Sequence, residues 1–266
     1  MNNCRMRIGV GFFGLPRSTP WTLPSFEQHL LEPARSLGDV EVRYHLYLQQ
    51  RVVNSRSRED AVLPPDHYAA FAAWPGELES ADGVAEASGL VHWSTYGDAY
   101  GDGFASLSNL LLQLHSLDRL TLQFDADPPD LVVFVRPDLM LHDSLADDMR
   151  ETLARPVDTV RLPSWQWNGG YNDRYALCRR EAFPVYGHRI RQIARLLDTR
   201  GGPLHAERLL RFALDAACVR IETTPVRASR VRVDGRVHPE TFRRASVSRR
   251  VRAAIRGLAK RIVLGR

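Results

Sequence analysis

A run of five apolar residues at 131–135 (Leu-Val-Val-Phe-Val) is the feature that most constrains the fold of this chain. Its length suits a strand that is buried on both faces. Arg136, Pro137 and Asp138 follow directly, so two charged side chains stand at the carboxyl end of the predicted strand. Ligands bind at that edge in open α/β sheets. Arg136 and Asp138 therefore either form part of a ligand site or make a surface ion pair that ends the strand.

Strands and helices alternate along the rest of the chain. Apolar runs and period-two patterns predict strands at 8–14, 40–48, 119–124, 131–135, 158–162, 174–178, 219–222 and 226–233. Helical spacing predicts helices at 24–37, 104–117, 143–153, 180–197 and 204–217, and the polar segment 49–66 is predicted to be a loop. This order favours a three-layer α/β/α fold with a mostly parallel sheet, formed by a single domain over residues 1–242.

Residues 243–266 differ in composition from this domain. They contain nine Arg or Lys residues and no acidic residue, which leaves 27 basic and 31 acidic residues in the remainder. Apolar residues recur among them every three or four positions, at Val247, Val251, Ile255, Leu258 and Ile262. The pattern predicts a basic amphipathic helix that lies either on an anionic membrane surface or against protein.

Composition also excludes several classes of protein. The basic residues are concentrated in the tail, so a nucleic-acid-binding domain is not expected. Cys4, Cys178 and Cys218 are too few and too scattered for a disulfide framework or a cysteine zinc site. No long apolar run is present, and residues 8–15 suit a first strand better than a signal peptide. We expect a cytoplasmic protein, with possible peripheral attachment to the inner face of the membrane.

The helix predicted at 104–117 carries a polar flank. Asn109, Gln113 and Ser116 lie at neighbouring angles on an otherwise apolar helix. These side chains face either a ligand site or water.

A loop rich in aromatic and polar residues precedes the strand predicted at 174–178. Trp165 and Trp167 lie close to paired glycines and to Asn172, Asp173 and Arg174. Exposed aromatic faces beside such polar groups suit stacking against a sugar or a base, with recognition of hydroxyl groups. The alternative is a loop that buried tryptophans anchor, with Asn172 and Asp173 as turn residues.

His205 and Glu207 lie at the start of the last predicted helix. Two residues apart on a helix, they cannot both face one site unless one of them stands at the helix start. Glu207 is the better candidate for an acid that faces a pocket, and the alternative is a solvated side chain.

Taken together, segments 12–17, 106–117, 131–138 and 172–176 resemble glycosyltransferases of the GT-A type. The resemblance is to uncharacterised bacterial proteins from polysaccharide and lipopolysaccharide gene clusters. Gly9, Gly11 and Gly14 match the spacing of a dinucleotide-binding loop, but they fall within the strand and lack the acidic partner.

The resemblance implies a nucleotide-sugar donor at the carboxyl edge of the sheet, with Gly14, Pro16 and Arg17 beside the nucleotide. Asp138 stands where the family has the last Asp of its Asp-x-Asp metal motif, which implies Mn²⁺ or Mg²⁺. Arg136 replaces the first Asp and could itself neutralise diphosphate charge. Residues 125–127 (Asp-Ala-Asp) spell the motif but precede the strand, and they rank second.

The resemblance also implies roles for the remaining candidates. Asn109 and Gln113 join the donor site, Trp165, Trp167, Asn172 and Arg174 bind sugar or acceptor, and Asp173 or Glu207 is the catalytic base. The expected reaction moves a hexose to a glycan or lipid-linked acceptor in bacterial surface polysaccharide synthesis. The alternatives are a non-catalytic nucleotide- or carbohydrate-binding protein of the same fold and, last, nucleic-acid binding through the tail.

Overall fold

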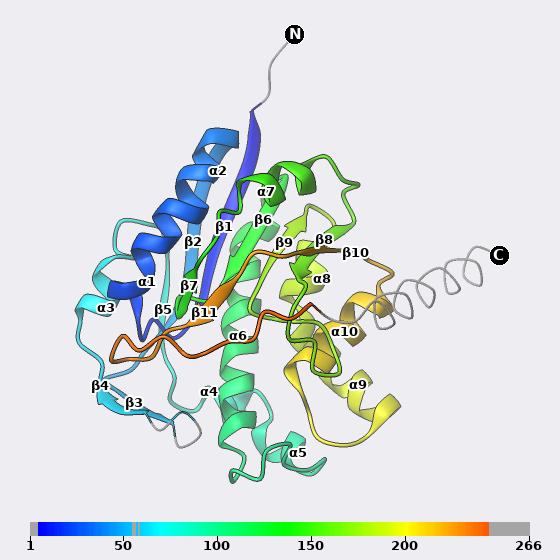
Figure 1. Cartoon of the computed structure of the whole chain (residues 1–266). Coiled ribbons are helices and arrows are strands. Elements are labelled where there is room, and N and C mark those ends of the chain that lie inside the picture. The colour runs from blue at the N-terminus through cyan, green and yellow to red at the C-terminus, as the bar shows by residue number, and fades with distance from the viewer. Residues whose placement is uncertain (1–4, 55–56, 58, 245–266) are drawn as a thin grey trace, which may run out of the picture.

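The computed structural model describes residues 5–54, 57 and 59–244, and it contains a seven-stranded sheet with helices on both faces (Figure 1). The strand order is β10-β8-β9-β6-β1-β2-β5. Only β9 runs antiparallel to its neighbours in this sheet. The predicted three-layer, mostly parallel fold is confirmed, whereas the tail helix falls outside the described residues from 245 onward.

The central strands are β1 (Met6–Gly14) and β6 (Leu131–Val135), which pair in parallel. Every residue of β6 is buried, as its continuous apolar run predicts. The other strands of the sheet are β2 (Gly38–Leu48), β5 (Gly76–Ser80), β8 (Thr159–Pro163), β9 (Tyr175–Arg179) and β10 (Arg220–Thr224). Two small antiparallel pairs lie outside it, β7 (Leu139–Leu141) with β11 (Ala228–Arg230) and β3 (Arg51–Asn54) with β4 (Glu59–Val62).

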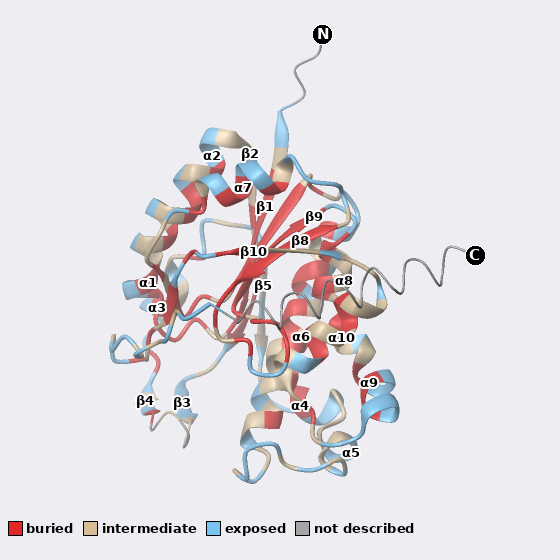
Figure 2. Ribbon diagram, turned by 45° about the vertical axis from the view of Figure 1, so that its right-hand side comes forward, coloured by how far each residue is buried: buried red, intermediate tan, exposed pale blue. Residues whose placement is uncertain are grey.

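Alternate residues of β1 enter two separate cores, one on each side of the sheet. On one side, Phe12 packs edge-on against Phe26 and Phe71. This layer contains α1 (Thr19–Phe26), a π-helical turn (Glu27–Leu31), α2 (Glu32–Leu37), α3 (Asp66–Ala69) and α7 (Ala146–Leu153). Figure 2 shows how completely the central strands are buried between the layers.

On the other side, Phe13 joins the core of α6 (Ala105–Asp125), α8 (Phe183–Gly187) and α10 (Ala206–Ala216). A further apolar cluster packs the start of α6 against α9 (Ile193–Arg200) and Leu204. The short helices α4 (Val84–Ala87) and α5 (Leu90–Ser94) lie beside that end of α6, and a 3-10 turn (Arg189–Gln192) precedes α9. None of the helices in the described ranges combines the length and apolar character needed to cross a bilayer.

Chain topology places a ligand site between β1 and β6. The chain leaves β1 for β2 on one side, and it later returns through α6 to β6 on the other side. Crevices at such switch points, outside the carboxyl ends of the strands, are where open α/β sheets bind ligands. β1 ends at Gly14, and the segment that follows β6 begins with Arg136.

Several predicted elements differ from the structure. The strand predicted at 226–233 is only β11, which pairs with β7 outside the main sheet. The strand predicted at 119–124 is wrong, because these residues form the last turns of α6. The predicted loop at 49–66 contains the β3–β4 hairpin. The helix predicted at 180–197 is divided into α8, the 3-10 turn and α9.

Candidate functional site

A pocket of about 460 Å³ opens at the switch point. Gly14 and Arg17 line it after β1, and Arg136 and Asp138 line it after β6. A tight turn follows β6, in which the Leu139 amide donates to the Arg136 carbonyl at 3.3 Å. The turn brings the predicted charged pair into the pocket, so the strand end is part of a cavity and not a surface ion pair.

Asp138 lies at the floor of the pocket with two arginines around it. Its side chain accepts two hydrogen bonds from Arg136, at 2.9 and 2.8 Å, and one from Arg17 at 2.7 Å. Asp138 is only 2% exposed. Burial alone would raise the pKa of its carboxyl, but the charges of Arg136 and Arg17 outweigh this effect and hold the pKa well below the ordinary value.

This donor set does not fit a divalent ion at Asp138. Both carboxylate oxygens already accept N–H bonds from guanidinium groups. A Mg²⁺ or Mn²⁺ ion there would displace these bonds and meet two positive charges within a few ångströms. The two arginines already supply the positive charge that a metal ion would bring to Asp138.

The second-ranked metal motif lies elsewhere in the molecule. Asp127 forms an ion pair with Arg7 near the amino end of β1, at 2.6 Å. Asp125 accepts a hydrogen bond from His188 at 3.0 Å. Because the pocket lies at the carboxyl end of β1, this Asp-x-Asp segment contributes no ligand to it.

Arg17 also belongs to a second network, which is centred on Glu59. The Glu59 carboxylate accepts bonds from Arg17 at 2.9 Å and Arg232 at 3.2 Å, and from the Val233 amide at 3.0 Å. Glu59 is buried and does not line the pocket. The counter-charge therefore lies behind the guanidinium groups, which face the cavity.

A similar cluster surrounds Glu240. Its carboxylate accepts bonds from Arg174 at 2.5 Å, Arg230 at 3.0 Å and Gln166 at 2.7 Å. Burial raises the pKa of Glu240, but the bond and charge of Arg174 outweigh it, and the pKa falls to about 2. Glu240 also stays behind the pocket lining, whereas Arg174 and Arg230 belong to it.

Arg230 and Arg232 also line the pocket, although the sequence did not predict them as site residues. The signal is present in the alternation of these arginines with Val231 and Val233, both of which are buried. An extended segment with this pattern turns its arginines to one side. No spacing rule, however, indicates that residues 230–240 return to the carboxyl ends of β1 and β6.

The polar flank of α6 faces the pocket and not bulk water, which were the two predicted alternatives. Asn109 and Gln113 line the pocket. Gln113 accepts a bond from Arg136 at 3.0 Å and donates to Asp173 at 3.2 Å. Ser116 is buried deeper and accepts a bond from the Gly14 amide at 2.8 Å. The helix thus fixes the turn after β1, and it links the arginine cluster to Asp173.

Glu207 stands in the first turn of α10, at the pocket wall. His205 precedes the helix in extended backbone, which allows both side chains to line the pocket. Glu207 accepts bonds from the backbone amide and the side-chain amide of Asn168, at 2.9 and 3.3 Å. Burial and the charge of Asp173 raise the pKa of Glu207 to about 7, so the carboxyl exchanges protons near neutral pH.

Both tryptophans of the 162–176 loop are buried, so the expectation of exposed aromatic faces is wrong. Trp165 is 1% exposed and Trp167 is 7% exposed. Their indole N–H groups donate to the carbonyls of Val226 and Pro163, at 3.0 and 2.7 Å. Neither ring lines the pocket, and the loop follows the alternative in which buried tryptophans anchor it.

The remaining predicted residues divide between the pocket and its support. Asp173 and Arg174 line the cavity. Asn172 is buried behind them, where it donates to the Trp165 carbonyl and accepts from the Arg174 amide, each at 3.0 Å. Pro16 also stays outside the lining, and its carbonyl faces His67 Nδ1 at 3.0 Å.

Comparison by sequence identifies no relative, because no known family model and no curated protein matches the chain. Comparison by structure finds the crystal structure of mouse xyloside xylosyltransferase 1 in its apo form. That structure is similar to this chain with a TM-score of 0.43 and 13% sequence identity. The superposition covers 82% of this chain and 84% of the mouse protein chain.

Proposed function

We propose that this chain is a glycosyltransferase of GT-A type that holds the diphosphate of a nucleotide-sugar donor with arginines in place of a metal ion. One observation carries the proposal. Five arginines, Arg17, Arg136, Arg174, Arg230 and Arg232, line a pocket at the switch point of an α/β sheet, opposite a carboxyl group that titrates near neutral pH.

The arginines suit a diphosphate for two reasons. Guanidinium groups bind phosphate oxygens through paired N–H donors, and they stay charged at every physiological pH. Asp138, Glu59 and Glu240 already hold the guanidinium groups in fixed positions. Little side-chain entropy is therefore lost when the ligand enters, and the charge is in place before the leaving group develops its own.

Glu207 suits the role of the base. In an inverting transfer, the carboxylate of Glu207 takes the proton of the acceptor hydroxyl, whose oxygen attacks the anomeric carbon of the sugar. The bond from that carbon to the diphosphate breaks, and the nucleoside diphosphate leaves with the electron pair. A base with a pKa near the working pH is the most effective one. Asp173 raises the pKa of Glu207 and stays the second candidate.

The finer proposal concerns the acceptor. The resemblance to bacterial polysaccharide and lipopolysaccharide cluster proteins favours a glycan or a lipid-linked acceptor in surface polysaccharide synthesis. The composition of residues 243–266 supports work at the inner face of an anionic membrane.

Calorimetric titration with nucleoside diphosphates and nucleotide sugars tests the proposal, in chelator and again with Mn²⁺. We expect one nucleotide to bind in chelator. The Arg136→Gln variant should bind it about 10–100-fold more weakly, because a charged hydrogen bond contributes about 1.5–3 kcal/mol. Arg119 of α6 pairs with Glu77 outside the pocket, so the control variant Arg119→Gln should bind the nucleotide as the wild type does.

Three outcomes would contradict the proposal in different ways. If no nucleotide binds, the chain is not a glycosyltransferase that uses nucleotide sugars. Binding that requires Mn²⁺ and is lost in Asp138→Asn restores Asp138 as a metal ligand. Tight binding without hydrolysis of the donor or transfer to any glycan acceptor leaves the non-catalytic binding protein.

A further inference from the structure

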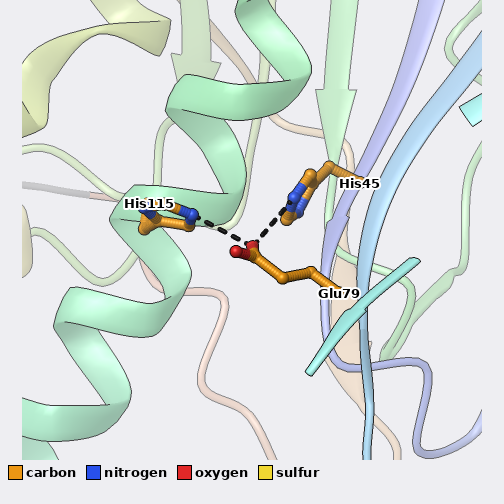
Figure 3. A group of neighbouring side chains, drawn as sticks. All are labelled: His45, Glu79 and His115. Carbon is orange, nitrogen blue, oxygen red and sulfur yellow. Dashed lines mark hydrogen bonds and ion pairs between the residues drawn. The ribbon is translucent and has the colours of Figure 1, made fainter. Parts of the chain in front are cut away.

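A second cluster of chemically active side chains lies outside the donor pocket. His45 of β2, Glu79 of β5 and His115 of α6 converge on one point, as Figure 3 shows. Glu79 Oε2 lies 3.1 Å from His45 Nε2 and 3.0 Å from His115 Nε2. None of the three residues lines the pocket.

The hydrogen bonds of Ser116 show which ring nitrogen of His45 carries a proton. The Ser116 hydroxyl donates its single hydrogen to the His45 carbonyl at 2.6 Å, and its oxygen accepts from the Gly14 amide at 2.8 Å. His45 Nδ1 lies 3.1 Å from the same oxygen. Because no hydroxyl hydrogen is left for that contact, His45 Nδ1 must be the donor.

The opposite nitrogen of His45 therefore carries a lone pair when the ring is neutral. That lone pair faces Glu79 Oε2, which also has only lone pairs to offer. Two acceptors at 3.1 Å repel each other unless a cation lies between them. A divalent ion between the two atoms would remove this repulsion, because both lone pairs could bind it.

We propose that His45, Glu79 and His115 bind a divalent transition metal, with Zn²⁺ as the ion that fits best. Two imidazoles and one carboxylate, with water in the fourth position, are an established zinc ligand set. Ligands about 2.1 Å from a tetrahedral ion lie about 3.4 Å apart, so the two measured separations need to widen by only a few tenths of an ångström.

The surroundings of the cluster match those of a metal centre. Metal-binding histidines usually donate their second N–H to a fixed acceptor, and Ser116 provides that acceptor for His45. The side chains of His115 and Glu79 are 28% and 37% exposed, which leaves a path for the ion and room for a bound water. Glu77 adds negative charge 3.8 Å from His45 Nε2 and pairs with Arg119.

Such an ion would tie the edge of the sheet to the second helical layer. In the seven-stranded sheet β5 pairs only with β2, and alternate residues of β5 are exposed. The ion would join β5 to β2 and to α6 through one ligand each. Through Ser116 and the Gly14 amide, it would also steady the turn that begins the donor pocket.

Zinc titration of chelator-treated full-length protein tests this site without any assay of sugar transfer. We expect one Zn²⁺ to bind per chain and to raise the melting temperature. Co²⁺ in place of Zn²⁺ should give the visible absorption of a four- or five-coordinate ion. Loss of one protein ligand, in Glu79→Gln or His115→Gln, should weaken binding by about 100-fold or more, beyond the range that an outer-sphere partner gives.

Glu77→Gln is the matched control, because it removes the same charge from the same strand, two residues away. It should keep the affinity within a few-fold of the wild type. The site is refuted if Zn²⁺ does not bind, or if Glu79→Gln and His115→Gln bind it as well as the wild type does. Equal weakening by Glu77→Gln and Glu79→Gln would also refute it, since attraction by charge alone then explains the result.

Discussion

At the scale of single residues, this molecule treats neighbouring carboxyl groups in opposite ways. Asp138 is buried between two guanidinium groups, which hold its pKa well below the ordinary value. Glu207 is partly buried, accepts bonds only from amide groups of Asn168, and has the negative Asp173 nearby, so its pKa rises to about 7. Two carboxyl groups with such different surroundings suit two different tasks in one pocket.

The raised pKa of Glu207 predicts a stability that falls as the pH rises. Between the ordinary glutamate pKa of 4.5 and the raised pKa of about 7, the folded state binds a proton that the unfolded state has lost, so stability decreases across that range. Glu207→Gln should therefore match the wild type near pH 5 and exceed it by about 1–3 kcal/mol at pH 8. Urea unfolding at the two pH values measures this difference. The exposed Glu86→Gln should show no such pH dependence, and a difference for Glu207→Gln that is equal at both pH values would contradict the assigned pKa.

The proposed role of Glu207 as the base predicts the pH profile of transfer. A base must be deprotonated, so turnover should rise with pH and level off above about 7. Glu207→Gln should lower turnover by about 100- to 10,000-fold while nucleotide binding is retained. Initial rates with saturating donor between pH 5 and 9 provide the test. In Asp173→Asn the charge that raises the Glu207 pKa is lost, so the profile should move to lower pH while turnover persists. Full activity of Glu207→Gln would remove Glu207 from the chemistry.

Single residues also show what local sequence can and cannot predict about the site. Arg136 and Asp138 were identifiable because they follow an apolar run that has only one reasonable structure. Trp165 and Trp167 were predicted to be exposed because a glycine-rich loop usually is. The burial of Trp165 depends on packing partners such as Phe242, more than 70 positions along the chain, which no local pattern reveals.

At the scale of elements, the packing of α6 against β1 explains the wrong strand prediction at 119–124 and the glycine spacing in β1. Residues 119–124 alternate Leu120, Leu122 and Phe124, which imitates a strand, yet Leu117, Leu120 and Phe124 continue the helical stripe of α6. On the facing strand, a Cβ at Gly11 would lie 2.7 Å from Leu120, and one at Gly9 would lie 2.8 Å from Phe124. These glycines therefore allow close helix–sheet packing, and their spacing does not mark a nucleotide loop.

This packing predicts the result of a double-mutant cycle. Gly11→Ala should destabilise the fold by about 1–3 kcal/mol, because the added methyl group overpacks a filled core. In a Leu120→Ala background the methyl group has space, and the cost should shrink by about 1 kcal/mol or more. Denaturant unfolding of the four proteins yields the coupling energy. If the stability effects of Gly11→Ala and Leu120→Ala are strictly additive, the two side chains are not in contact.

At the scale of the whole molecule, strand order determines which distant segments build the pocket. The alternation of strands and helices predicted the layers and the mostly parallel sheet, and the apolar run of β6 predicted the edge where the site lies. Residues 59 and 230–240 reach that edge only through the tertiary fold. Two of the five pocket arginines, Arg230 and Arg232, were therefore out of reach of any argument from sequence spacing.

The charge distribution of the whole chain predicts how it meets a membrane. Residues 1–242 hold 27 basic and 31 acidic residues, so an anionic surface repels the domain and attracts only the nine basic residues that follow. The full chain should sediment with anionic vesicles, less so as salt rises, and a chain that ends at residue 244 should remain in solution. Val251→Gln with Ile255→Gln keeps every charge of the tail but removes apolar contact, so it should weaken vesicle binding clearly. If this variant sediments like the wild type, and the tail instead binds oligonucleotides in a salt-dependent way, the tail is a nucleic-acid-binding segment and the membrane assignment is wrong.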